Sequence, residues 1–205
     1  MSNTVPQSEH LARLLRDTNE VDARVKAVAE RLDEAQLRWT PPDGAWGAGQ
    51  IFEHLCISND SYLVRLRALI ARPNAPRAAA DAVWKPSVMG GLLARSVSPQ
   101  GTRKLSAPKI YRPPPQPRAH VVEEFLRQQE QLRELLTASA ALDWRRIRLS
   151  SPVTPLIRLN LGDAFTVLVV HAQRHTGQLE RLVARADFPA SRAATVEGGP
   201  GSAPR

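Results

Sequence analysis

Hydrophobic residues recur at steps of three and four positions in four long stretches of the chain, which is the spacing of one face of an α-helix. The stretches are rich in leucine and valine, and they cover residues 9–37, 48–71, 118–140 and 161–186. The last stretch follows Asn160, a favoured N-cap residue, and carries Asp163 at the position of a capping-box acid. The pattern predicts an all-α fold, a four-helix bundle.

Residues 72–117 separate the second and third predicted helices and carry nine of the chain's 17 prolines. A connection of this length can return the chain to the end of the bundle at which the second helix began. We therefore expect the second and third helices to run parallel, in an up-down-down-up order with one long crossover. The sequence VWKPSVMGGLLARSV within the crossover is compatible with a short helix.

A chain of 205 residues, 42% of them hydrophobic, can bury one sizeable core. We therefore expect residues 1–186 to form one domain. Residues 187–205 are small, polar and rich in glycine and proline, so this tail is expected to be disordered.

The formal net charge of +8 comes mostly from the crossover, because no acidic residue lies between Asp81 and Glu123. A nucleic-acid-binding protein usually presents basic residues on one face of a helix, together with aromatic residues. No predicted helix has that pattern, so a nucleic-acid partner is not expected.

The longest apolar run, near AFTVLVV, is too short to cross a bilayer, so no membrane partner is expected. The N-terminal residues contain no apolar segment of signal-peptide length. Cys56 is the single cysteine, and we expect it to be a small buried residue without a disulfide. These features favour a reducing, cytoplasmic location.

Two histidines interrupt the apolar stripe of the last predicted helix, in the sequence HAQRHTGQLERL. His171 and His175 are four residues apart, so their rings lie on one helical face and can reach one metal ion. His54 lies on the apolar stripe of the 48–71 helix and is the candidate third ligand. From the residues alone, a metal site and three hydrogen-bonded core histidines both stay open.

Other polar residues break the stripes of the first and third predicted helices, namely Thr18 and either Gln128 or Gln129. A polar patch inside an apolar bundle is costly unless its members are satisfied, so these positions suggest a shared ion, water or ligand.

Two further histidines and two tryptophans are expected to have structural roles only. His10 and His120 fall near predicted helix starts, where we expect surface residues. Trp39 and Trp46 flank the proline-rich turn between the first two helices and are expected to clamp it.

The segments RWTPPDGAWGAGQIFEHLCISNDSYLVRL and LGDAFTVLVVHAQRHTGQLERLV resemble the DinB-like superfamily of damage-inducible and YfiT-type metalloenzymes. The resemblance spans roughly residues 9–186. It implies an up-down-down-up bundle, often dimeric, with a divalent metal such as zinc or nickel held by three histidines, here His54, His171 and His175. Gly47 departs from the family, which usually has a serine there to cap the helix, so a looser helix start is expected.

Three neutral imidazoles leave coordination positions of a divalent ion open, and such an ion lowers the pKa of a bound thiol or water. Some members of the family resemble transferases that use glutathione, mycothiol or bacillithiol. The resemblance therefore implies a thiol-dependent S-transferase acting on a small molecule. A metal-dependent hydrolase and a non-catalytic stress-response protein that binds a metal or small ligand are the alternatives.

Candidates for the remaining roles are less sharply marked. Tyr62 is a candidate proton donor, whereas Gln178 and Gln50 are candidates for orienting ligands or bound water. The candidates for receiving the carboxylates of a thiol cofactor are basic residues of the crossover, Arg103, Lys104 and Arg112.

Overall fold

Four long helices form the body of the protein in a computed structural model that describes residues 4–101 and 106–191. They are α1 (Gln7–Ala29), α3 (Ala48–Ile70), α5 (Val121–Ala138) and α6 (Leu161–Val183). Shorter helical elements are α2 (Glu34–Arg38), α4 (Val88–Val97) and the 3-10 turn η1 (Lys109–Tyr111). The short strands are β1 (Val5–Pro6), β2 (Val83–Trp84), β3 (Arg148–Ser150) and β4 (Arg158–Asn160).

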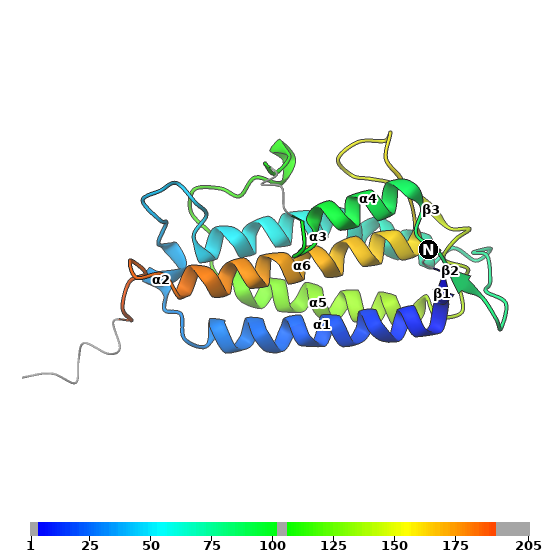
Figure 1. Cartoon of the computed structure of the whole chain (residues 1–205), viewed down its shortest axis with the longest axis horizontal. Coiled ribbons are helices and arrows are strands. Elements are labelled where there is room, and N and C mark those ends of the chain that lie inside the picture. Colours follow the sequence, from blue (N-terminus) through cyan, green and yellow to red (C-terminus); the bar gives the residue numbers. More distant parts are fainter. Residues whose placement is uncertain (1–3, 102–105, 192–205) are drawn as a thin grey trace, which may run out of the picture.

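The four long helices follow the up-down-down-up order, as Figure 1 shows. α3 and α5 run in the same direction, and α1 and α6 run opposite to them. α1 and α3 each pack against both α5 and α6. The predicted fold class, with its long crossover between the second and third long helices, is therefore confirmed.

The helix predicted over residues 9–37 is wrong in one respect, because it is two helices. α1 ends at Ala29, and Asp33 begins α2 with a reciprocal capping box. The Asp33 side chain accepts a hydrogen bond from the Gln36 backbone N–H at 2.9 Å, and the Gln36 side chain accepts one from the Asp33 N–H at 3.0 Å. This cap starts a new helix although the leucine spacing continues across it.

Two antiparallel strand pairs, β1 with β2 and β3 with β4, were not predicted. Strands of two or three residues are too short to show alternation in the sequence. The short helix compatible with the crossover sequence is present as α4, and Asn160 and Asp163 form the capping box expected at the start of α6.

Only the beginning of the predicted tail, up to residue 191, lies within the described part of the chain. There the Gln36 side chain donates to the Pro189 carbonyl oxygen at 2.7 Å, and Phe188 packs edge-on against Trp39. The expectation of disorder for residues 192–205 concerns positions outside the described residues.

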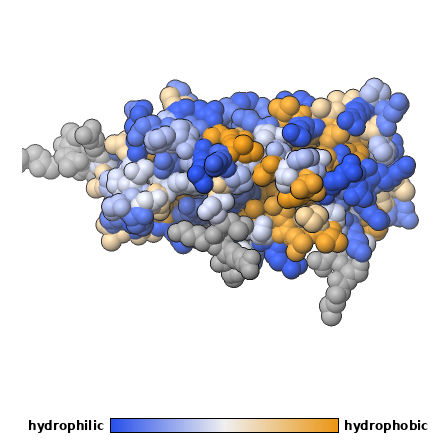
Figure 2. All heavy atoms as spheres, turned by 90° about the horizontal axis from the view of Figure 1, so that it is seen from above, coloured by the Kyte–Doolittle hydropathy of each residue, from blue (hydrophilic) through white to orange (hydrophobic). Residues whose placement is uncertain are grey.

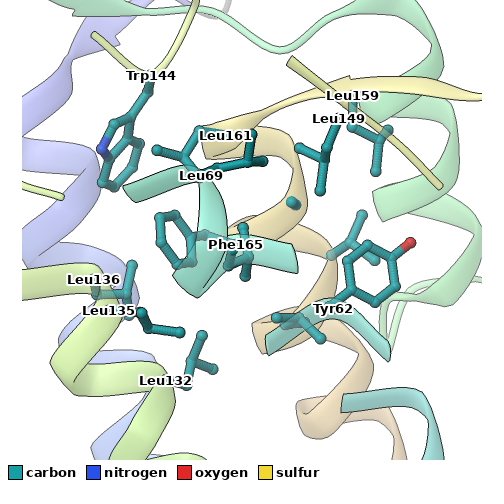
Figure 3. Close-up of a cluster of buried hydrophobic side chains, with 14 of the residues drawn as sticks. Tyr62, Leu69, Leu132, Leu135, Leu136, Trp144, Leu149, Leu159, Leu161 and Phe165 are labelled. Carbon is teal, nitrogen blue, oxygen red and sulfur yellow. The ribbon is translucent and has the colours of Figure 1, made fainter. Parts of the chain in front are cut away.

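Buried hydrophobic side chains form two clusters along the bundle. One contains Phe165, Trp144 and Leu161 and is shown in Figure 3. The other contains Phe52 and Phe125. Between the clusters lie buried polar side chains from three helices, which we call the polar layer: Thr18, Asn59, Gln128 and Gln129. The predicted polar interruptions of the stripes are thus confirmed as buried positions.

His10 corrects a prediction, because it is buried rather than exposed, with 1% of its surface accessible. Its ring stacks on Trp84 with centroids 3.7 Å apart, and its Nε2 is 2.9 Å from Thr166 Oγ1. The cause is β2, an element that the sequence pattern did not reveal, which brings Trp84 beside α1. His120, by contrast, is exposed at the start of α5, as predicted.

Exposed apolar side chains gather on the outer side of α4, where Val88, Met89 and Leu92 face solvent. Figure 2 shows hydrophobic residues on this face of the molecule, surrounded by hydrophilic ones. Among the described residues, no helix combines the length and the hydropathy that a bilayer crossing requires.

Candidate metal centre

Three histidines from two helices converge in the structure, as the sequence predicted. The ring centroids of His54 and His171 are 5.0 Å apart, those of His54 and His175 are 4.8 Å apart, and those of His171 and His175 are 4.6 Å apart. One ring nitrogen from each residue can be chosen so that all three lie within 4.8 Å of one another. No other group of three metal-ligating side chains comes together in residues 4–101 and 106–191.

Local sequence determines where these rings lie. His171 and His175 occupy successive turns of α6, whose start is fixed by the capping box of Asn160 and Asp163. His54 lies in the second turn of α3, which packs directly against α6.

The backbone around the start of α3 leaves no room for a side chain at position 47. A Cβ atom at Gly47 would overlap the carbonyl oxygen of Trp39. The Gln50 side chain instead caps the helix, accepting a hydrogen bond from the Gly47 N–H at 3.1 Å. The N-cap position itself makes no side-chain hydrogen bond, so the expectation of a looser helix start stays a prediction.

Hydrogen bonds assign the protons on two of the rings. His54 Nδ1 is 2.7 Å from the Tyr111 carbonyl oxygen, which can only accept, so Nδ1 carries the proton. His175 Nδ1 is 2.9 Å from Gln178 Oε1, which assigns its proton in the same way. In the neutral form of each ring, Nε2 is then left with a free lone pair.

Burial keeps all three rings neutral near pH 7. It lowers the pKa of His54, lowers that of His175 to about 3, and lowers the pKa of His171 well below its ordinary value. Neighbouring histidines add to the effect at His171 and His175, since a second positive charge would be repelled. Neutral imidazole is the form that binds a metal ion.

The spacing of one pair of ring nitrogens fits a divalent ion. His54 Nε2 and His171 Nε2 are 3.1 Å apart. Two nitrogens bound to zinc at about 2.0 to 2.1 Å in tetrahedral geometry are separated by roughly 3.3 Å, which is close to that spacing. Three buried or partly buried neutral imidazoles are also the donor set that zinc and nickel accept.

Trp46 forms a wall of the centre, which corrects its predicted role as a clamp. Its ring lies 4.8 Å from that of His54 and 6.4 Å from that of His175, measured between centroids. Trp39 packs instead against Phe188. The two tryptophans thus have different partners, and Trp46 shields the histidines with an apolar surface.

The structure places the remaining predicted residues in different surroundings. Gln178 contacts a histidine, because its side chain accepts the bond from His175. Tyr62 is buried in the hydrophobic cluster of Figure 3, with its hydroxyl hydrogen-bonded to Ser151, and burial raises its pKa to about 12. The recorded partner of the Tyr62 hydroxyl is thus Ser151 rather than one of the three histidines, and its role as a proton donor stays a prediction.

Gln50, besides capping α3, donates to the carbonyl oxygens of Pro114 and Pro115 and does not bond a histidine. Arg112 is exposed, whereas Arg103 and Lys104 lie outside the described residues. Cys56 is fully buried, as predicted, and burial raises the pKa of its thiol to about 12.

A sequence model of the DinB superfamily matches residues 18–179, an interval that contains all three histidines. The chain belongs to the DinB superfamily. Among solved structures, this DinB-superfamily chain is similar to YfiT from Bacillus subtilis, described as a probable metal-dependent hydrolase with an unusual four-helix bundle topology. The identity is 18%, the match covers 87% of this chain and 89% of the other, and the TM-score is 0.55, so the likeness establishes the fold. Comparison with curated protein sequences gives no match.

Sequence reasoning missed two residues beside the centre. Tyr111 contributes a backbone carbonyl, which every residue type carries, so no sequence signal exists for it. Glu53 precedes His54 and is 2% exposed, paired with Arg118. An acidic residue in an otherwise apolar stretch of helix was the available signal for this buried ion pair.

Proposed function

We propose that His54, His171 and His175 bind one divalent metal ion, zinc or nickel, and that this DinB-superfamily protein is a metal-dependent enzyme acting on a small molecule. The observation that carries the proposal is the convergence of three neutral imidazoles, with the Nε2 atoms of His54 and His171 3.1 Å apart. A metal held by three histidines would retain open positions and would lower the pKa of a water or thiol bound there.

The chain's own residues prepare the ligands. The Tyr111 carbonyl and the Gln178 side chain hold the protons of His54 and His175 on Nδ1, so that both Nε2 atoms are available. Trp46 covers His54 and His175 with an aromatic ring and limits the access of water from that side. These contacts keep the donors oriented before any ion arrives, which reduces the cost of ordering them.

The reaction that we propose first is S-transfer, in which a low-molecular-weight thiolate forms a bond to an electrophilic carbon and the leaving group departs with its electron pair. The thiol's proton passes to solvent. The family resemblance and the cationic crossover support this choice, because glutathione and bacillithiol carry carboxylates.

Hydrolysis is the second candidate reaction, and the structural likeness to YfiT favours it. A third proposal is a stress-response protein that binds a metal or small ligand without turnover.

Metal analysis of protein purified without an affinity tag tests the site. We expect about one zinc or nickel ion per chain after reconstitution, as for a site with three protein ligands and an open position. Loss of binding in His171→Ala and retention in His120→Ala, which removes an exposed histidine, would support the assignment. Equal binding by both variants would refute it.

Activity assays separate the reactions. We expect the metal-loaded protein to conjugate a generic electrophile with at least one of glutathione, mycothiol or bacillithiol. Hydrolysis of activated esters or amides without any thiol would favour the second candidate, and inactivity in both assays would favour the binding protein. Activity that survives His171→Ala would contradict a metal mechanism for that reaction.

We also propose that two chains associate through the exposed apolar side of α4, since contiguous apolar surface marks interaction sites. A dimer was expected from the family resemblance, and light scattering of Leu92→Glu against the parent chain tests it. A cytoplasmic location, expected from the single cysteine, is likewise a proposal, and it agrees with the use of a reduced thiol.

A further inference from the structure

Residues 111–118, in the connection between α3 and α5, lie along one side of α3, and we call this segment the strap. It bonds to four residues of the helix. They are Gln50, Glu53, His54 and Ser61. Their spacings from Gln50 are three, four and eleven positions, which places them on one helical face. The strap therefore follows the face of α3 that carries a proposed metal ligand.

One end of the strap is anchored by a buried ion pair. The Glu53 carboxylate accepts hydrogen bonds from the Arg118 backbone N–H at 2.6 Å and from Arg118 Nε at 2.9 Å. The guanidinium also approaches through Nη2 at 2.8 Å, although its outer part is exposed. A buried carboxylate is costly without a partner, so Glu53 holds both the backbone and the side chain of Arg118 in place.

The other end is anchored through the Tyr111 side chain. The Ser61 hydroxyl donates to the Ser58 carbonyl oxygen at 2.7 Å, so Ser61 Oγ is left to accept. The Tyr111 hydroxyl lies 2.9 Å from that oxygen and donates to it. Tyr111 thus bonds α3 twice, through its hydroxyl to Ser61 and through its carbonyl to His54.

We propose that the strap is a positioning device for His54, in which Glu53 and Ser61 act through Tyr111. The anchored carbonyl oxygen of Tyr111 keeps the His54 proton on Nδ1 and the Nε2 lone pair directed at the other two histidines. Without that acceptor, the neutral ring can carry its proton on Nε2, which removes the lone pair that a metal requires.

The expected effect of the strap on metal affinity rests on the proposed function. Its effect on which nitrogen of His54 carries the proton does not. Because coupling between two equilibria is reciprocal, a strap that favours metal binding is itself stabilised by the metal. Partners that orient ligating histidines change metal affinity by about 10- to 100-fold when they are removed. We expect the strap variants to fall in the lower part of that range, since each removes one anchor rather than the carbonyl.

The chain offers a matched control, because it has only two tyrosines and each bonds a serine. Tyr111→Phe removes the hydroxyl that anchors the strap. Tyr62→Phe makes the same chemical change at a hydroxyl that bonds Ser151 and does not anchor the strap. Glu53→Gln has its control in Glu34→Gln, which breaks an exposed ion pair with Arg38 on α2.

The first measurement uses metal-free protein with ¹⁵N-labelled histidine. Long-range ¹H–¹⁵N spectra report which nitrogen of His54 carries the proton. We expect the Nδ1–H form in the parent chain and in both controls, and a growing Nε2–H fraction, or faster exchange of the Nδ1 proton, in Tyr111→Phe and Glu53→Gln. Identical His54 signals in all five proteins would overturn the proposal.

The second measurement is zinc affinity by competition with a chromophoric chelator, for variants whose thermal unfolding shows that they fold. We expect roughly 10-fold weaker binding in Tyr111→Phe and Glu53→Gln and unchanged binding in the controls. Failure of the parent chain to bind zinc or nickel would refute the proposed function while leaving the proton result to stand. Tight binding in the parent and equally tight binding in the strap variants would overturn the positioning role.

Discussion

His54 and His171 are 117 positions apart in the sequence, yet their Nε2 atoms lie 3.1 Å apart across the interface of α3 and α6. Two lone pairs at that separation repel each other unless a proton or a cation lies between them. A bound cation would therefore stabilise the folded protein as well as serve its chemistry, because the unfolded chain does not hold the rings together.

Saturating zinc or nickel is expected to raise the unfolding temperature of the parent chain. A ligand at about 100 times its dissociation constant adds about 2.7 kcal/mol, which corresponds to roughly 5 to 10 °C for a protein of this size. The shift should vanish in His175→Ala and persist in His120→Ala, and differential scanning fluorimetry measures both. A shift of equal size in the two variants would place the ion elsewhere.

His10 is expected to make the protein less stable in mild acid. Burial lowers its pKa from 6.5 to about 3, so below pH 6.5 the unfolded chain takes up a proton that the folded chain refuses. The free energy of unfolding therefore falls as the pH drops from 6.5 toward 3, by up to about 1.4 kcal/mol per pH unit for this one group.

Denaturant titrations at pH 7.5 and pH 5.0 check this dependence. His10→Gln keeps a polar side chain between Thr166 and Arg13 but does not titrate, so it should lose less stability between the two pH values than the parent chain. The buried histidines of the metal centre contribute to the remaining slope in both proteins. Equal slopes would show that His10 takes up its proton without unfolding.

Gly90 and Gly91 are neighbours in α4, but substitution by alanine is expected to change the free energy of unfolding in opposite directions at the two positions. A Cβ atom at Gly90 would overlap the Asp163 carboxylate, which caps α6 and accepts a bond from the Ser87 N–H. At Gly91 it would meet only Pro86, at an ordinary distance of 3.7 Å. Gly90→Ala should cost about 1 to 3 kcal/mol by forcing α4 away from α6, whereas Gly91→Ala should gain up to about 1 kcal/mol through helix propensity.

Chemical denaturation of the two variants measures the difference. A neutral Gly90→Ala variant would mean that α4 is not packed on the start of α6 in solution.

Gly47→Ser introduces the residue that the family resemblance implies at this position and should nevertheless destabilise this chain. The added side chain would overlap the Trp39 carbonyl oxygen, with an expected loss of about 1 to 3 kcal/mol in the free energy of unfolding. Zinc affinity should fall in parallel, because His54 lies in the second turn of the helix that is displaced. A more stable Gly47→Ser protein would show that a serine cap fits and would refute the steric argument.

The sequence predicts the four long helices and the three histidines because both depend on periodicity within single helices. Apolar stripes define which face of α3 and α6 is buried, and the histidines lie on those stripes. Their convergence then follows from the packing of adjacent helices. The chemistry of the centre was accessible for the same reason, since it depends on side-chain type rather than on loop conformation.

The contacts that the sequence could not predict involve segments without a regular spacing of hydrophobic residues. The Tyr111 carbonyl reaches His54 through a proline-rich connection whose course no residue pattern specifies. Trp84 buries His10 from a strand of two residues, and the break before α2 depends on one capping box. The first two contacts are set by tertiary packing, which outweighs local preference, whereas the capping box is a local signal that the continuing leucine spacing obscured.

The polar layer has a consequence for how the helices align. Thr18, Asn59 and the pair of glutamines at 128 and 129 lie at one level, with leucine- and phenylalanine-rich packing on either side. Suppose that one helix moved along its axis by a single turn, about 5.4 Å. Its amide or hydroxyl group would then enter a hydrophobic cluster, and a leucine would face the polar side chains of the other helices. That free-energy penalty would fix the axial register of the helices, and with it the position along α6 that His54 faces.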